Sequence, residues 1–122
     1  MRFIDSNVLA YASYQNKNQE RCQQLIKEGG IVNTVNLIEA YNTLFTVTDA
    51  DHATQAIRTL LKSNLCIVPV DINLLFEALK RNKKYKLLFN DLLHYITALL
   101  HNCSEIASYD TDFDGLEIKR IT

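Results

Sequence analysis

Short apolar segments alternate with longer segments of helical periodicity along the whole chain. Strands are expected at 2–5, 31–34, 65–70, 105–110 and 117–122, and helices at 7–14, 17–28, 35–47, 51–63, 72–86 and 91–102. Strands joined by helices of this length require right-handed crossovers, so the sheet should be mostly parallel with helices on both faces. The sequence therefore predicts an α/β fold, with one domain over residues 1–122.

Capping and breaking residues support several of these boundaries. Gly29 and Gly30 should end the helix over 17–28, because glycine is a strong C-terminal stop. Asp51 and Asn90 are the expected N-caps of the helices that follow them. Only three glycines and one proline are present, which argues against long loops and against the turns of a β-sandwich.

Composition narrows the class of protein. A hydrophobic fraction of 48% with 22% charged residues is typical of a globular protein, and a net charge of −1 excludes a generally basic nucleic-acid binder. Cys22, Cys66 and Cys103 are isolated from one another, and the pattern predicts buried free thiols in a reducing cytosol. Because the first apolar segment already resembles a core strand and no apolar run could span a bilayer, neither a secretory signal nor membrane insertion is expected. A cytoplasmic location follows.

Acidic residues lie where the predicted sheet would bind a ligand, which is beyond the carboxyl ends of its strands. They end strands or lie near helix starts, and they are Asp5, Glu39, Asp91, Asp110 and, two residues further on, Asp112. Helix N-termini favour ionised carboxylates, but several acids crowded together repel unless a cation joins them. With no His or Cys at ligand spacing, an oxygen-only cluster of this kind suits Mg²⁺ or Mn²⁺.

Each acid also has an ordinary interpretation. The chain has 14 acidic residues, so Asp5 and Asp91 can be helix caps and Glu39 can be a solvated helix residue. Glu39 is the more informative of the three, because it lies beside the apolar stripe of its helix rather than opposite it. Asp110 directly follows an apolar strand, which should place its carboxylate beside Asp5, whereas Asp114 precedes a glycine and is typical of a turn.

Three segments resemble the PIN-domain ribonucleases, and in particular the VapC toxins of toxin–antitoxin pairs. The segments are "FIDSNVLAYA", "NLIEAYNTL" and "FNDLLHYITALLHNCSEIASYDTDF", and the resemblance covers essentially the whole chain. It implies a sheet of four to five strands in the order 3-2-1-4-5. The acids of the family match Asp5, Glu39, Asp91 and Asp110, Ser6 matches a hydroxyl beside the first acid, and Asp112 matches an acid found in many members.

The resemblance implies a divalent-metal-dependent endoribonuclease whose hydrolysis leaves a 5′-phosphate and a 3′-hydroxyl. In this scheme Asp5, Asp91 and Asp110, joined by Asp112, hold Mg²⁺ or Mn²⁺ directly or through water. Glu39 is a ligand or orients water, and Ser6 bonds the substrate phosphate or a metal-bound water. Metal binding lowers the pKa of water toward neutrality and offsets charge on the phosphate oxygens. The implied partners are an RNA substrate, a VapB-like antitoxin and a second copy of the chain.

Other features allow two interpretations. The basic segment 80–86 surrounds Tyr85, and Lys83 and Lys84 could contact phosphate while the ring stacks on a base, or the segment could be a solvated helix end. His94 lies three residues after Asp91 and either touches substrate or is a polar residue on a helix flank, whereas His52 and His101 should lie at the surface. The helices over 7–28 contain more apolar surface than a small sheet needs, which suggests an interface with an antitoxin or a second copy.

Three alternatives remain open. A receiver-type or phosphatase domain could use Asp5 as a phosphoacceptor, but such sites usually place a second acid beside it or two residues on, where Ser6 and Asn7 stand. A PIN fold kept only as an interaction module would lack one of the acids, and all four main positions are filled. An active PIN nuclease of RNA processing, without an antitoxin, fits the same residues.

Overall fold

All five strands lie in one parallel sheet. The computed structural model describes residues 1–122, and its strands follow the order β3-β2-β1-β4-β5. The strands are β1 (Arg2–Ile4), β2 (Ile31–Asn33), β3 (Cys66–Val68), β4 (Glu105–Ala107) and β5 (Lys119–Ile121). The predicted α/β class and the order 3-2-1-4-5 are confirmed, although each strand is only three residues long and shorter than expected.

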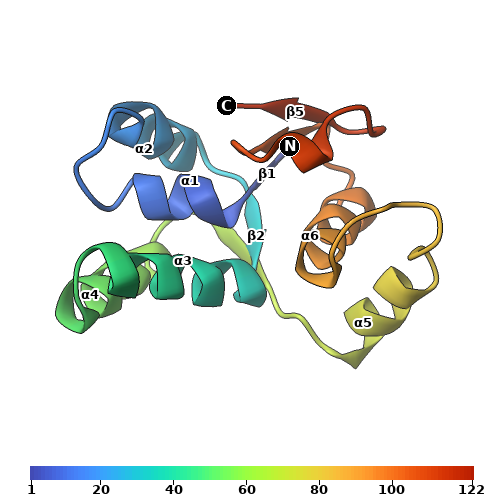
Figure 1. Ribbon diagram of the computed structural model, residues 1–122, viewed down its shortest axis with the longest axis horizontal. Helices are drawn as coiled ribbons and strands as arrows, with labels where there is room; N and C mark the ends of the chain where they lie inside the picture. Colours follow the sequence, from blue (N-terminus) through green and yellow to red (C-terminus); the bar gives the residue numbers. More distant parts are fainter.

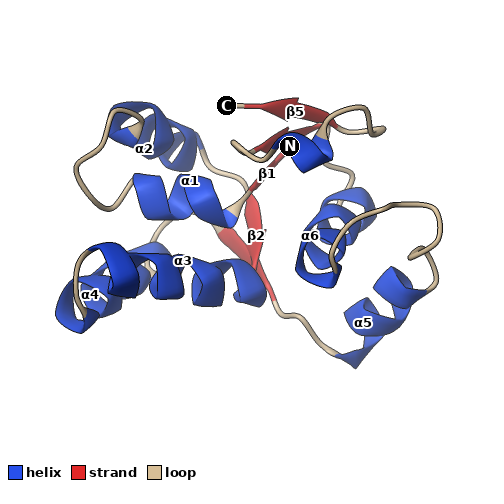
Figure 2. Cartoon of the chain, viewed as in Figure 1, coloured by secondary structure: helices blue, strands red, loops and turns tan.

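Helices cover both faces of this sheet, as predicted. They are α1 (Ser6–Tyr11), α2 (Gln19–Glu28), α3 (Thr34–Val47), α4 (Ala50–Leu61), α5 (Ile72–Leu79) and α6 (Phe89–Leu100), followed by the short 3₁₀ turn η1 (Thr111–Phe113). Figure 1 shows α1 to α4 on one side of the strands and α5 with α6 on the other. The same division between helical layers and strands is visible in Figure 2.

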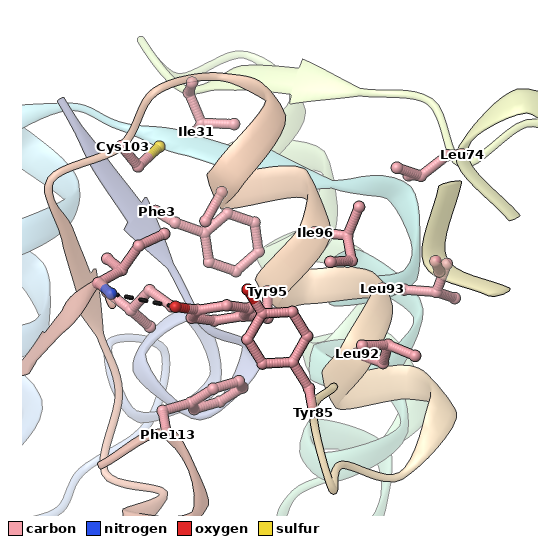
Figure 3. Packing of buried hydrophobic residues seen from close by; sticks show 14 residues of the cluster. Phe3, Ile31, Leu74, Tyr85, Leu92, Leu93, Tyr95, Ile96, Cys103 and Phe113 are labelled. Atoms are coloured by element: carbon pink, nitrogen blue, oxygen red, sulfur yellow. Dashed lines mark hydrogen bonds between the residues drawn. The ribbon is translucent and has the colours of Figure 1, made fainter. Parts of the chain in front are cut away.

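Neighbouring residues of each inner strand point to opposite faces and enter different cores. Phe3 packs with α5 and α6, whereas Ile4 packs with the helices on the other face. The same alternation separates Ile31 from Val32 on β2. Figure 3 shows Tyr95 of α6 among the aromatic residues of the core that contains Phe3. There its hydroxyl accepts a hydrogen bond from the Ile118 amide (3.0 Å). Burial on both faces holds the inner strands rigidly, and with them the residues that follow their carboxyl ends.

The helix predicted over 72–86 ends at Leu79, seven residues early. Tyr85 is only 4% exposed, and its ring lies 4.9 Å from that of Tyr95. Its hydroxyl donates a hydrogen bond to Glu117 (2.6 Å). Because the ring is buried, the prediction that it stacks on nucleic-acid bases is wrong. The basic residues are mostly solvated, as the other interpretation expected, but they form a turn after α5 rather than part of the helix.

Two predicted helix caps are also wrong. Asp49, not Asp51, caps α4, and its carboxylate accepts from the His52 amide (2.7 Å). Leu88 occupies the N-cap position of α6, and Asn90 lies inside the first turn with its amide turned toward Glu39 (3.1 Å). Several neighbouring residues can often cap the same helix, and tertiary contacts determine which one does so.

Two expectations about surface and burial need correction. Cys22 and Cys103 are buried free thiols, but Cys66 is exposed because β3 is an edge strand. The early helices bury Leu9 and Leu25 completely and Ile26 in part. The exposed apolar side chains lie instead mostly on α3 and α5 and at the start of α6 with its N-cap. None of the helices is long and apolar enough to cross a membrane.

Candidate metal-binding site

Asp5 stands at the carboxyl end of β1, where it caps α1. One carboxylate oxygen accepts from the Ser6 amide (2.8 Å) and the other from the Ser108 hydroxyl (2.6 Å). The residue is only 5% exposed. Burial raises the pKa of this carboxyl, and the hydrogen bonds from Ser108 and Ser6 oppose that rise. Asp5 is therefore both a helix cap and a site residue, and the two interpretations of the sequence do not compete.

Asp110 reaches the site through Ser108 rather than directly from a strand. β4 ends at Ala107, so the prediction that Asp110 follows the strand directly is wrong by two residues, Ser108 and Tyr109. The Ser108 hydroxyl that donates to Asp5 also accepts from the Asp110 amide (3.0 Å). The Asp110 carboxylate in turn caps η1 by accepting from the Asp112 amide (2.9 Å). The buried serine thus ties two acids from distant parts of the chain together.

Glu39 projects from α3 and is held by three donors. Its Oε1 accepts from the Ser6 hydroxyl (2.5 Å) and from His94 Nε2 (2.6 Å), and its Oε2 accepts from the Asn90 amide (3.1 Å). Burial acts to raise the pKa of Glu39, but the hydrogen bonds from His94 and Ser6 outweigh it, and the net shift is downward. Glu39 is therefore held in its ionised form.

His94 is completely buried beside this carboxylate. The interpretation of His94 as a polar residue on a helix flank is wrong, because every residue from 92 to 98 of α6 is buried. The ring reaches Glu39 from inside the protein, and ligand atoms of Asp5, Glu39 and His94 lie within 4.8 Å of one another. The cluster is thus not purely one of oxygen atoms. The signal in the sequence was a histidine within an otherwise apolar helical run.

The other carboxylates form a more open group. Ligand atoms of Asp91, Asp110 and Asp112 lie within 4.8 Å of one another, and Asp91 and Asp110 are only partly buried while Asp112 is exposed. Burial and the negative charges of Asp5 and Asp110 raise the pKa of Asp91 to about 6. Burial and repulsion from the neighbouring carboxylates both disfavour the ionised form of Asp91, and a bound cation would stabilise that form.

The predicted acids meet in one cleft of about 270 Å³ at the carboxyl edge of the sheet. Its lining residues are Asp5, Ser6, Asn7, Tyr11, Glu39, Thr43, Asp91 and Asp110. Carboxylates from four separate chain segments therefore converge, and this donor set fits a hard divalent cation. Asp112 joins the cluster only through Asp91 and Asp110.

The two predicted basic contacts are not part of this cleft. Lys84 forms an exposed ion pair with Glu117 (3.1 Å), and Lys83 is exposed on the turn after α5. Neither lines the acidic cleft. The residues that the sequence interpretation missed are uncharged ones, Asn33, Asn36 and Ser108, which are fully buried around the acids. Nothing distinguishes them locally from capping residues.

An all-parallel sheet with carboxylates clustered beyond its strand ends defines an α/β protein suited to bind cations. A family model described as "PIN domain" matches residues 2–119. The chain belongs to the PIN domain family. No curated protein matches it in sequence.

Solved structures with low sequence identity have the same fold. One is VapC20 of Mycobacterium tuberculosis, described as a toxin that cleaves the sarcin–ricin loop, with 16% identity, a TM-score of 0.78, and coverage of 97% of this chain and 98% of the other. Another comes from a toxin–antitoxin complex of Klebsiella pneumoniae, with 17% identity, a TM-score of 0.76, and coverage of 100% and 97%.

Proposed function

We propose that this protein is a divalent-metal-dependent endoribonuclease and the toxin of a VapBC-type toxin–antitoxin pair. The observation that carries the proposal is the convergence of Asp5, Glu39, Asp91 and Asp110 on one cleft of a PIN domain. The description of the Mycobacterium tuberculosis neighbour as an RNA-loop-cleaving toxin supports RNA as the substrate class.

The cation is Mg²⁺ or Mn²⁺, held by Asp5, Asp91 and Asp110, with Asp112 as an additional ligand. When bound, the ion supplies positive charge for the phosphate oxygens and acidifies water. Asp91 supports this assignment, because its raised pKa arises from burial and from the neighbouring charges of Asp5 and Asp110. Removing the proton from Asp91 is favourable once a cation stands beside it.

Ser6 acts on Glu39 rather than on the substrate in this proposal. Its hydroxyl has one hydrogen, which it donates to Glu39, and it accepts a hydrogen bond from Asn36 (3.0 Å). A phosphate oxygen needs a donor, so Ser6 could contact it only by releasing Glu39. Glu39 is left to accept a proton from water, or to orient water, at Oε2, whose one hydrogen bond comes from Asn90.

Cleavage of a structured RNA should require added Mg²⁺ or Mn²⁺, and EDTA should abolish it. Restoring activity with excess Mg²⁺ controls for damage by the chelator. A preparation of Asp49→Asn serves as the matched control variant, because Asn caps a helix as well as Asp and this position lies outside the cleft. Undiminished cleavage in EDTA would exclude the metal-dependent mechanism.

We propose that an antitoxin binds in a groove between α2 and α4. The groove has a volume of about 450 Å³, and Ala12, Ile26, Ala56 and Leu60 are its apolar lining. The Klebsiella pneumoniae neighbour comes from a toxin–antitoxin complex, which supports a partner of this kind. Ala56→Glu should prevent co-elution with the product of an adjacent antitoxin gene, whereas Thr46→Glu on α3 should not. Equal co-elution of both variants would contradict this assignment.

A homodimer is the proposed resting assembly. The exposed large apolar side chains of α3, of α5 and of the start of α6 with its N-cap are Ile38, Phe45, Val47, Ile72, Leu75, Phe76, Leu79, Leu88 and Phe89. Such surface usually marks an interface, and two-fold dimers are the commonest closed assembly. Light scattering at tens of micromolar should give twice the chain mass, and Phe76→Glu should give the monomer. A monomeric wild type would contradict the proposal.

A further inference from the structure

Two buried asparagines at the start of α3 have fixed amide orientations. The Asn33 amide N–H donates to Asn36 Oδ1 (2.8 Å), and the Asn36 amide N–H donates to Asn33 Oδ1 (2.9 Å). This reciprocal capping box uses both side-chain oxygens on the backbone. Each NH₂ group must therefore point the other way, into the protein.

Both NH₂ groups point toward the His94 ring. Asn33 Nδ2 lies 3.1 Å from His94 Nδ1. Asn36 Nδ2 donates to Ser6 Oγ (3.0 Å) and lies 3.3 Å from Nδ1 and 3.4 Å from Nε2 of the ring. Because the Asn33 NH₂ group can only donate, Nδ1 has to accept from it, and the ring hydrogen must be on Nε2. Nε2 then donates to Glu39 Oε1 across 2.6 Å. The sequence pair Asn33 and Asn36 thus sets the tautomer of a histidine some sixty positions along the chain.

This arrangement determines which oxygen of Glu39 is free. Oε1 already accepts from His94 and from Ser6, so both of its lone pairs are used. Oε2 accepts only from Asn90, at the longer distance of 3.1 Å. One lone pair therefore remains on Glu39, on the oxygen that does not contact His94.

We propose that His94 is a positioning residue, held as the Nε2–H tautomer by Asn33 and Asn36, which fixes Glu39 so that Oε2 alone serves the cation or its water. The proposal rests on the metal-dependent function argued above. It excludes His94 as a metal ligand, although Asp5, Glu39 and His94 lie within ligand distance of one another. Neither ring nitrogen has a free lone pair, because Nε2 carries hydrogen and the single lone pair of Nδ1 accepts from Asn33.

The first test is spectroscopic. Long-range proton–nitrogen spectra of the metal-free protein at neutral pH should show hydrogen on His94 Nε2 only, and adding Mg²⁺ should leave that hydrogen in place. Hydrogen on Nδ1, or loss of the Nε2 hydrogen when Mg²⁺ is added, would overturn the proposal. This measurement requires no nuclease activity.

The second test uses two variants that each replace one ring nitrogen. Glutamine can place an NH₂ group where Nε2 stands, so His94→Gln should bind Mn²⁺ nearly as tightly as wild type and should retain most cleavage. Asparagine reaches only the position of Nδ1, so His94→Asn should lose about 10- to 100-fold in Mn²⁺ affinity or in cleavage rate. Equal losses in the two variants, at matched thermal stability, would contradict a positioning role.

His101→Asn is the control, since His101 lies exposed at the end of the same helix. It should change neither Mn²⁺ affinity nor cleavage. If the wild-type protein cleaves no RNA, the proposed function fails, and the ring spectra and the Mn²⁺ affinities still decide the role of His94. If RNA cleavage needs metal but His94→Asn behaves as wild type, the function stands and this inference fails.

Discussion

Asp5 and Glu39, the buried half of the acidic cluster, accept hydrogen bonds from serine, histidine and asparagine side chains. Asp91, Asp110 and Asp112, the open half, lie within 4.8 Å of one another with far fewer donors. The pKa of Glu39 is lowered, although burial raises that of Asp5, whereas burial and neighbouring negative charges raise the pKa of Asp91 to about 6. Hydrogen bonds thus hold the buried carboxylates in place before any metal binds. The open carboxylates repel one another, and a bound cation would offset that repulsion.

The largest expected effect comes from removing a ligand that belongs to either half. Asp110→Asn and Asp5→Asn should each reduce RNA cleavage by a factor on the order of 10²–10³, because the charge that holds the cation is lost. Single-turnover rates at saturating Mg²⁺ measure this loss, with Asp49→Asn as the control. An Asp110→Asn variant as active as wild type would show that the open half does not bind the catalytic ion.

Asp112→Asn should have a smaller effect. The residue is exposed and lies outside the cleft lining, so we expect cleavage to fall by about 10-fold at low Mg²⁺ and to recover as Mg²⁺ is raised. A titration of rate against Mg²⁺ concentration distinguishes weakened binding from lost chemistry. Failure to recover at any concentration would place Asp112 among the essential ligands.

Opposite stability changes should distinguish the two halves in the metal-free protein. Asp91→Asn removes repulsion and should stabilise the fold by about 1 kcal/mol, less than the full pKa shift implies because the carboxylate is partly solvated. Glu39→Gln loses charge-assisted hydrogen bonds and should destabilise it by about 2 kcal/mol. Urea unfolding at neutral pH in EDTA measures both. If both variants changed the free energy of unfolding in the same direction, the proposed difference between the two halves would be contradicted.

The pH dependence of stability should follow from the same carboxyl group. In the unfolded chain Asp91 ionises near its ordinary pKa of 3.8, whereas in the folded protein it keeps its proton up to about 6. Between these values the folded state binds more protons, so raising the pH lowers the contribution of Asp91 to stability. Asp91→Asn should flatten the stability curve between pH 4 and pH 6 relative to wild type. Parallel curves would contradict this.

The smallest effect is expected at Asp114. It pairs with Arg120 (2.7 Å) on the surface, and exposed ion pairs contribute little to stability because water screens them. Asp114→Asn should leave cleavage within about two-fold of wild type and reduce stability only slightly. A large loss of cleavage would mean that Arg120, which also donates to the Ser108 carbonyl (3.0 Å), helps to place Asp110.

Patterns of a few residues predicted most of the fold. Alternating strand-like and helical segments led to the parallel sheet, since short strands joined by helices have few other arrangements. The position of Asp5 after a buried strand and of Glu39 beside an apolar stripe pointed to one edge of that sheet. The prediction of a helix beyond Leu79 was wrong because a tertiary contact outweighed the local pattern. The residues after Leu79 have a helical pattern, but Tyr85 is buried against Tyr95.

The sequence by itself determined the strand order, through the resemblance to a family, and the acids that gather at the carboxyl edge, through their positions after strands and at helix starts. Only the tertiary structure decided which groups surround those acids. His94, Asn33, Asn36 and Ser108 are fully buried around them. Hydrogen bonds between side chains distant in the chain depend on the packing of whole elements, which no short stretch of sequence specifies.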